Sequence, residues 1–203
     1  EREEAVGILY KVGPSRQYQN LGQVANLLQP GDVVEVDGDA TYGSVLLSRN
    51  GTASSKITIR GVRINGQRPV VRGGTNTVEA QANHYVFEGL DLTEGSFRCF
   101  YHHAHDITLR DSVIHDCPAH GILGADGDSG SLLLEYTEVH HSGEGTQNHS
   151  IYMATDEKAH PKSRFRMQFS WVHDTTGGTW VYVQVGAQRI AHEDRADDQH
   201  GQH

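Results

Sequence analysis

The chain has 203 residues, a length that suits one domain with a core large enough to fold without crosslinks. Acidic residues outnumber basic ones, 26 Asp and Glu against 17 Lys and Arg, and the formal charge is -9. Nucleic acid binding needs a basic surface, so we expect no nucleic acid partner. No apolar run approaches the roughly 18 residues of a membrane-spanning helix, so we expect no membrane span.

The cysteine and histidine contents bear on the redox compartment and on the possible chemistry of the protein. Cys99 and Cys117 are too few for a disulfide framework and make a poor metal site by themselves, so they leave the redox compartment open. The 14 histidines are the most unusual feature of the composition. Imidazole titrates near neutral pH and binds metals, so this excess bears on function.

The first predicted element is a short amphipathic helix over Tyr18 to Gln29, which Pro30 and Gly31 end. Its apolar face would hold Leu21, Val24, Leu27 and Leu28. A strand is predicted directly after it, over Asp32 to Val36. Because the open end of a repetitive fold exposes the core, we expect this helix to be an N-terminal cap.

Five segments further along the chain align without gaps and define an internal repeat. They are ITIRGVRING (Ile57 to Gly66), YVFEGLDLTE (Tyr85 to Glu94), ITLRDSVIHD (Ile107 to Asp116), LLLEYTEVHH (Leu132 to His141) and FRMQFSWVHD (Phe165 to Asp174). The third residue of each segment is apolar (Ile59, Phe87, Leu109, Leu134, Met167). The eighth residue of each segment is also apolar (Ile64, Leu92, Ile114, Val139, Val172). The third positions are 28, 22, 25 and 33 residues apart, so insertions vary in length while the motif is kept.

This repeat predicts a solenoid of short strands. Apolar and polar residues alternate with period two, and the spacing is shorter than the about 40 residues of a propeller blade. A second strand per coil is predicted over residues 97–101, 120–123, 149–153 and 179–183, with Phe100, Ile122 and Ile151 in register. We therefore predict an all-β fold, a right-handed parallel β-helix of about five to seven coils with a capping helix at its N-terminal end.

The strand pattern fades after Val185, and the remaining sequence is polar and without periodicity. We expect residues 1–188 to form a single β-helix domain and residues 189–203 to be a polar tail. An uncapped C-terminal end would leave strand edges unpaired, and such edges tend to pair with another chain. A homo-oligomer joined through this end is therefore one expected assembly.

The segment from Val12 to Gly61 resembles the opening of the pectate-lyase-like right-handed parallel β-helix superfamily. Its GPSRQY, PGDVVEV and NGTASSKITIRG stretches match the motifs that lead into the first full coil of those proteins. The later HGIL and HSIY strands also look like the GIY strands of the same repeats. The superfamily includes pectate, alginate and chondroitin lyases, polysaccharide hydrolases, epimerases and binding modules. The resemblance thus implies carbohydrate and leaves the reaction open.

The ninth column of the repeat reads Asn65, Thr93, His115, His140 and His173. Strands on neighbouring coils are about 4.8 Å apart, which would stack the three imidazoles. The tenth column adds Glu94, Asp116, His141 and Asp174. A metal or acid/base strip is one interpretation. We favour a structural ladder of polar side chains, because three ligands in a line do not surround an ion.

A second histidine group is better arranged for chemistry. His120 and His149 open equivalent strands on adjacent coils, and acidic loops follow both strands. Neutral imidazole near carboxylates suits general acid/base or metal-assisted catalysis on a sugar. The candidate catalytic residues are His120, His149 and Tyr152, the candidate substrate-binding residues are Tyr101, His102 and Trp171, and the candidate ligands of a divalent metal (Ca or Zn) are Asp126, Asp156 and His160. In the alternative, the two histidines are turn residues bonded to neighbouring backbone.

Two further features of the sequence are interpreted mainly as structural. The fourth column runs Arg60, Glu88, Arg110, Glu135 and Gln168, which predicts an ion ladder across the coils. Ser150 lies next to His149 but lacks the Gly-x-Ser-x-Gly elbow of esterases. An esterase is therefore the weakest of the enzyme hypotheses.

The resemblance, together with the candidate site, implies a secreted or cell-surface protein that acts on an extended polysaccharide, its signal peptide absent from this chain. Cleavage by elimination or hydrolysis is the preferred activity. A non-catalytic polysaccharide-binding module is the alternative, because a short β-helix offers little groove. Tyr136, Phe169 and Trp171 would stack on sugar rings in either case, unless they pack against a loop.

Overall fold

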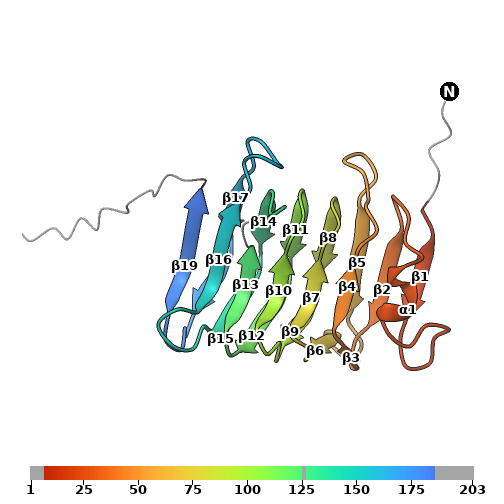
Figure 1. Ribbon diagram of the computed structural model, residues 1–203. Helices are drawn as coiled ribbons and strands as arrows, with labels where there is room; N and C mark the ends of the chain where they lie inside the picture. The colour runs from red at the N-terminus through yellow and green to blue at the C-terminus, as the bar shows by residue number, and fades with distance from the viewer. Residues whose placement is uncertain (1–6, 125–126, 186–203) are drawn as a thin grey trace, which may run out of the picture.

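The chain winds into a parallel β-helix, and the computed structural model describes residues 7–124 and 127–185 of it. Successive coils add strands to three sheets, here named A, B and C, and every strand pairs in parallel with its counterpart in the next coil. Figure 1 shows the coils side by side, from β1 at one end to β19 at the other. The predicted parallel β-helix is confirmed.

The strands of each sheet follow one another along the chain. Sheet A contains β1 (Leu9–Val12), β2 (Val33–Asp37), β5 (Ile57–Val62), β8 (Tyr85–Glu88), β11 (Ile107–Arg110), β14 (Leu132–Glu135) and β17 (Phe165–Gln168). Sheet B contains β3 (Thr41–Gly43), β6 (Val70–Arg72), β9 (Asp91–Thr93), β12 (Val113–Cys117), β15 (Glu138–Ser142) and β18 (Trp171–His173). Sheet C contains β4 (Val45–Leu47), β7 (Asn76–Ala80), β10 (Arg98–His102), β13 (His120–Gly124), β16 (His149–Thr155) and β19 (Thr179–Val185).

The core is a set of apolar columns, one residue per coil from each sheet. Phe87 pairs with Leu109, and Leu109 with Leu134, so the predicted third column is in register and fully buried here. Phe100, Ile122 and Ile151 form the predicted column of sheet C. Because side chains of a strand alternate between its faces, the residues between these columns point outward and are available for function.

Two predicted core positions are wrong. Val71, and not Ile64, pairs with Leu92, because residues after β5 make an excursion closed by an antiparallel bridge between Ile64 and Gln67. Arg72 therefore also takes the ninth-column place predicted for Asn65, opposite Thr93. Met167 is in register but 40% exposed, because β17 is the last described strand of sheet A.

The helical cap is shorter than predicted. Only Gly22–Ala25 (α1) is helical, although Leu21, Val24 and Leu28 are buried as expected. Leu27 is exposed. Side chains satisfy the neighbouring backbone instead: Asn20 Oδ1 accepts from the N–H of Gln23, and Gln23 Oε1 accepts from that of Asn20. Such local bonds compete with a longer helix.

The predicted ion ladder on the outer face of sheet A is confirmed. Arg110 lies 2.7 Å from Glu88, whose carboxylate also faces Arg60, and Gln168 donates to Glu135 at 2.8 Å. The first two contacts join three consecutive coils and the third joins the next two, all through exposed or half-buried side chains. Their contribution to stability is modest, because water screens exposed charges.

A disulfide joins Cys99 of β10 to Cys117 of β12, at the corner between sheets C and B. Both residues are fully buried, and 18 residues, nearly one coil, separate them. At the same corner of adjacent coils, Thr77 donates to the carbonyl of Thr93 and Ser150 bonds Thr175. The disulfide thus replaces a hydroxyl contact that other coils use to close this corner.

The described residues include no helix long and apolar enough to cross a membrane. Asp126 and the predicted polar tail, residues 189–203, lie outside the described residues.

Candidate functional site

The outer face of sheet C gathers the largest set of candidate residues. One outward column runs Glu79, Tyr101, Leu123, Tyr152 and Tyr182 across five neighbouring strands. A second column, at the start of the same strands, contains Asn76, Arg98, His120, His149 and Thr179. Adjacent strands of a sheet are about 4.8 Å apart, so the two columns form one strip along the axis of the β-helix.

Aromatic and imidazole rings cover the C-terminal part of this strip. Tyr152 stacks on Tyr182 with ring centres 5.1 Å apart, and His149 lies parallel to both at 5.7 and 5.4 Å. His120 tilts against His149 at 5.9 Å. The predicted group of His120, His149 and Tyr152 is therefore brought together by the fold. These rings offer flat surfaces of the kind that bind the apolar faces of sugars.

The hydrogen bonds of His120 and His149 define what the two rings can do. Nδ1 of His120 accepts the N–H of His149 at 3.2 Å, and Nδ1 of His149 accepts the N–H of Thr179 at 3.2 Å. Burial lowers the pKa of both imidazoles, that of His120 to about 4. Each neutral ring therefore carries its proton on Nε2 and is a hydrogen bond donor. This matches the alternative in which they are turn residues bonded to backbone.

Arg98 lies between two aromatic rings at the N-terminal side of His120. Its guanidinium carbon is 4.0 Å from the ring centre of Phe97 and 4.0 Å from that of Tyr101. Nη1 donates to Asn76 Oδ1 at 3.1 Å, while Nε is buried without a hydrogen bond partner. Among the described residues no carboxylate forms an ion pair with Arg98; Glu79, which accepts a hydrogen bond from the same Asn76, acts on its charge only from further away. An unpaired cation held by cation–π contacts is suited to an anionic ligand.

His103 continues the stack that begins at Phe97. Its ring is parallel to that of Tyr101, with centres 5.3 Å apart. Neither ring nitrogen of His103 has a hydrogen bond partner among the described residues, in contrast to His120 and His149. Both ring nitrogens of His103 are therefore available to bond a ligand. Neither Arg98 nor His103 was assigned a role from the sequence; both lie in the run FRCFYHH, whose aromatic and basic residues become distinctive only once their neighbours on sheet C are known.

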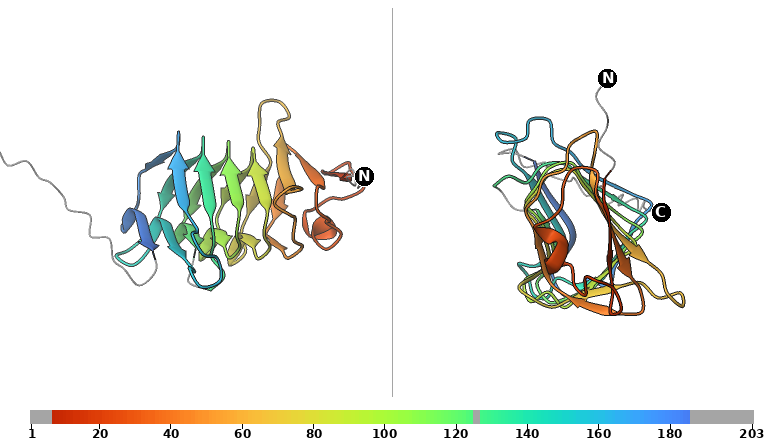
Figure 2. Two further views of the ribbon diagram at one scale, coloured as in Figure 1. Left: turned by 90° about the horizontal axis from the view of Figure 1, so that it is seen from above. Right: turned by 90° about the vertical axis from the view of Figure 1, so that its right-hand side faces the viewer.

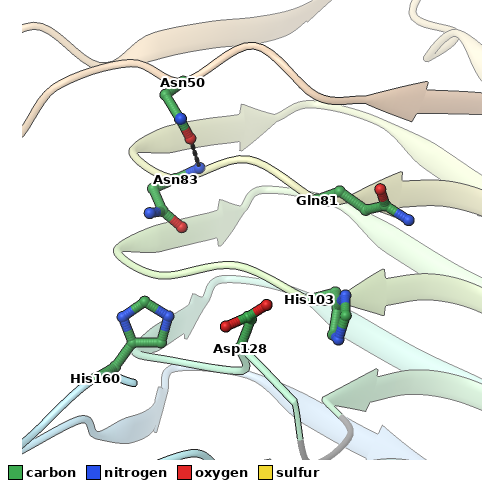
Figure 3. A pocket seen from close by; sticks show the side chains of 6 residues that line it. All are labelled: Asn50, Gln81, Asn83, His103, Asp128 and His160. Carbon is green, nitrogen blue, oxygen red and sulfur yellow. Dashed lines mark hydrogen bonds between the residues drawn. The ribbon is translucent and has the colours of Figure 1, made fainter.

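A hollow of about 370 Å³ adjoins the strip where the chain turns from sheet C to sheet A. Its lining is polar: Asn50, Gln81, Asn83, His103, Asp128 and His160. Figure 3 shows Asp128 between His103 and His160, and Asn50 bonded to the backbone of Asn83 on the next coil. Amide, imidazole and carboxylate groups of this kind can bond sugar hydroxyls.

The predicted metal ligands do not form a closed site among the described residues. Asp156 Oδ1 accepts the N–H groups of Lys158 and Ala159, and Oδ2 accepts that of Asp128. The ring of His160 stacks on that of His105, with centres 4.7 Å apart. No group of three or more potential metal ligands occurs in the described part of the chain. Asp126 falls outside it, so the metal assignment stays a prediction.

Two predicted substrate-binding residues lie elsewhere. His102 is fully buried inside the coil, where Nε2 donates to the carbonyl of Gly130 at 3.1 Å and burial lowers the ring's pKa to about 4. It cannot touch a ligand on the outer face. Trp171 begins β18 in sheet B and stacks on His173 at 3.8 Å, so it does not belong to the strip on sheet C. Tyr101 lies in the strip as predicted.

The three histidines of the ninth column stack on sheet B as predicted. Ring centres are 5.2 Å apart for His115 and His140, and 5.1 Å for His140 and His173. Asp91 and Asp116 bond the two nitrogens of His115 and raise its pKa to about 9. These carboxylates occupy the nitrogens a metal would need, which favours the structural interpretation.

No known protein family matches the chain, and no curated protein matches its sequence. Solved structures share its fold. The alginate lyase of Paenibacillus sp. strain FPU-7 is 22% identical, with a TM-score of 0.62 over 82% of this chain and 55% of that enzyme. Pectate lyase Pel9A is 12% identical, with a TM-score of 0.71 over 95% and 57%. A pectin methylesterase of Aspergillus niger is 10% identical, with a TM-score of 0.56 over 94% and 89%.

The chain therefore shares the parallel β-helix fold of these enzymes, as its N-terminal segment predicted. It spans little more than half the length of the two lyases.

Proposed function

We propose that the protein binds an acidic polysaccharide along the outer face of sheet C and cleaves it. The observation that carries this proposal is Arg98, a cation held between Phe97 and Tyr101 with no carboxylate partner among the described residues. A guanidinium in this setting favours the carboxylate of a uronic acid residue, which it can bind through two N–H groups. The rings of Tyr152 and Tyr182 on later coils would hold further sugars of the same chain.

Elimination is the reaction that the residues around Arg98 suit best. A base removes the proton from the carbon next to the sugar carboxylate. That electron pair forms a C=C bond as the glycosidic C–O bond breaks, and the departing oxygen takes up a proton. In our proposal Arg98 binds and neutralises the carboxylate, His103 is the base, and the Tyr101 hydroxyl supplies the proton to the departing oxygen. Cleavage by hydrolysis would instead need a pair of carboxyl groups on either side of the glycosidic bond.

The fold comparisons support a carbohydrate substrate, because the similar structures include an alginate lyase and a pectate lyase. An esterase has less support. The hydroxyl of Ser150 is buried and bonded to Thr175 at 2.6 Å, so it is not placed as a nucleophile. Secretion is part of the proposal and is supported by the buried disulfide, since disulfides persist mainly in oxidising compartments.

Non-catalytic binding is the second candidate function. The observation in its favour is that the partly exposed His149 has its Nδ1 bonded to backbone, which leaves an Nε2–H donor that suits recognition of a sugar hydroxyl better than proton abstraction; His120 is only 6% exposed. A divalent metal ion bound by Asp156, His160 and Asp126 would be compatible with either function, and it remains a proposal.

A panel of alginate, polygalacturonate and a neutral xylan tests these functions. Product absorbance reports elimination, new reducing ends report cleavage of any kind, and pull-down reports binding. We expect Arg98→Ala to lose both binding and activity, and His103→Gln to lose at least about a hundredfold in activity while binding is kept. His140→Gln, on sheet B, is the matched control and should behave as the parent. Binding without product selects the binding module, and neither binding nor product rejects both functions.

A further inference from the structure

Three exposed aromatic side chains gather at the corner between sheets A and B. Tyr136 and Phe169 follow β14 and β17, and Trp171 begins β18; they are 61%, 72% and 63% exposed. The rings of Tyr136 and Phe169 are stacked, with centres 5.1 Å apart. All three line a hollow of about 320 Å³. We call this group the aromatic platform.

The backbone under the platform is strained. Tyr136 and Phe169 have φ of 48° and 50°, in the left-handed region. The same turn in the two preceding coils carries Gly89 and Asp111, with φ of 72° and 44°. Glycine and aspartate tolerate this conformation, whereas a bulky side chain disfavours it. Two consecutive coils thus place aromatic residues at the position of the repeat that suits them least.

Core packing does not explain these residues. Tyr136 has a described coil on either side of it, β11 on one and β17 on the other, and is still mostly exposed. Residues with disfavoured backbone angles occur preferentially at functional sites. An exposed aromatic side chain that costs folding free energy is therefore a candidate for ligand contact.

The charges around the hollow are balanced by pairs. Arg68 lies 2.7 Å from Asp111, and Glu138 lies 2.9 Å from His173. The hollow therefore offers aromatic faces and polar rims without a free charge, which suits the CH face and hydroxyls of a pyranose ring. A protein partner fits less well, because a stable protein interface needs about 20 to 30 residues a side.

We propose that the aromatic platform is a second polysaccharide-binding site, separate from the strip on sheet C. The three sheets enclose the core, so the corner between A and B lies across the molecule from sheet C, as the view along the axis shows (Figure 2). The platform would hold a neighbouring stretch or strand of the polysaccharide that sheet C binds. In naming that ligand the inference rests on the proposed function.

The test compares a platform variant with a strip variant. Tyr136→Asn, Phe169→Asn and Trp171→Thr together remove the platform, and asparagine suits the left-handed turns. Arg98→Ala with Tyr101→Ala disables the strip. Each protein is assayed for retention on calcium alginate and polygalacturonate gels, for activity on short soluble oligosaccharides, and for its urea midpoint and sedimentation coefficient.

We expect the platform variant to bind the gels about tenfold more weakly, to keep the parent's activity on oligosaccharides, and to have a urea midpoint at or above that of the parent. In a Trp180→Phe background Trp171 is the single tryptophan, so its fluorescence should respond to alginate oligosaccharides. These results together would establish a separate binding site.

The outcomes separate this inference from the proposed function. Gel binding equal to the parent's by the platform variant overturns the platform and leaves the strip intact. Loss in the platform variant with parent-like binding by the strip variant supports the platform and rejects sheet C. A parent carrying Met167→Lys and Val183→Lys, which blocks association through the last strands, is the control; if it binds the gels as weakly as the platform variant, the loss reflects association between copies and the inference is overturned. A parent that binds neither gel rejects both sites.

Discussion

For His120 and His149 the sequence predicted the position of each residue but not the hydrogen bonds of its ring. The repeat predicted that they lie on adjacent coils, and their rings are indeed 5.9 Å apart. Their roles depend on two backbone hydrogen bonds: the N–H of His149 donates to Nδ1 of His120, and the N–H of Thr179 donates to Nδ1 of His149. No sequence pattern reports these bonds, because they depend on the rotamer at the end of a turn.

His149 gives the first prediction. His149→Ala should weaken binding to polysaccharide, because it removes a ring from the stack on sheet C, while the loss of one hydrogen bond to the Thr179 N–H should cost about 1 kcal/mol of stability. His149→Asn is the matched control, since its side-chain oxygen can accept the same N–H but offers no ring. Pull-down and urea unfolding measure the two effects. Parent-like binding by both variants would remove His149 from the site.

The histidine stack on sheet B predicts a pH dependence. The pKa of His115 is raised to about 9 in the folded protein, chiefly by its bond to Asp91. A raised pKa adds stability that is complete below the unfolded value of about 6.5 and is lost as the pH rises through 9. Asp91→Asn should therefore destabilise the protein near pH 6, by no more than about 3 kcal/mol, and much less near pH 10. Urea unfolding at both pH values checks this.

Glu144→Gln is the control for that prediction, because Glu144 is exposed and its side chain bonds no histidine. A destabilisation by Asp91→Asn that is equal at both pH values would mean that the carboxylate acts through packing and not through the charge on His115.

At the scale of elements, strands were easier to predict than their exact register. Four aligned segments place their eighth residues correctly, because each runs from sheet A to sheet B through a short turn. The first segment fails at Ile64, since the excursion to Gln67 precedes β6 and Val71 takes the core position. Both residues are apolar and β-branched, so the sequence could not decide between them.

The disulfide is a second feature that spacing alone left open. Cys99 and Cys117 are nearly one coil apart, but only the placement of β10 and β12 at one corner brings their Cα atoms to 5.9 Å. We predict that Cys99→Ser with Cys117→Ser lowers the free energy of unfolding by about 2–4 kcal/mol, because the crosslink restricts the unfolded chain. Urea unfolding with and without reductant measures it. Reductant should destabilise the parent and leave the variant unchanged, and a variant as stable as the oxidised parent would contradict the prediction.

At the scale of the whole molecule, the architecture itself was predictable because each coil repeats the same pattern of apolar and polar residues. The site was less so, since it combines outward residues from coils 22 or more residues apart with the long insertions between strands. Core packing requires an apolar residue at the same position of each coil, but it sets no such requirement on the outward residues. Arg98 and His103 stand out only when their neighbours on sheet C are known.

The last described strand of each sheet bears on how the molecule associates. The last described strands β17, β18 and β19 each have one unpaired edge in the described part of the chain, and Met167 and Val183 are 40% and 43% exposed there. Unpaired edges bind other strands, so we propose that two copies associate through this end. The sedimentation coefficient should then rise with protein concentration.

Met167→Lys with Val183→Lys should abolish that rise, because burying two lysines in a strand interface is costly. Leu9→Lys is the matched control: Leu9 is 51% exposed on β1, the edge strand at the opposite end of sheet A, so its substitution should leave the association unchanged. A coefficient independent of concentration in the parent rejects association altogether. Loss of association in the Leu9 variant alone would transfer the contact to the N-terminal end.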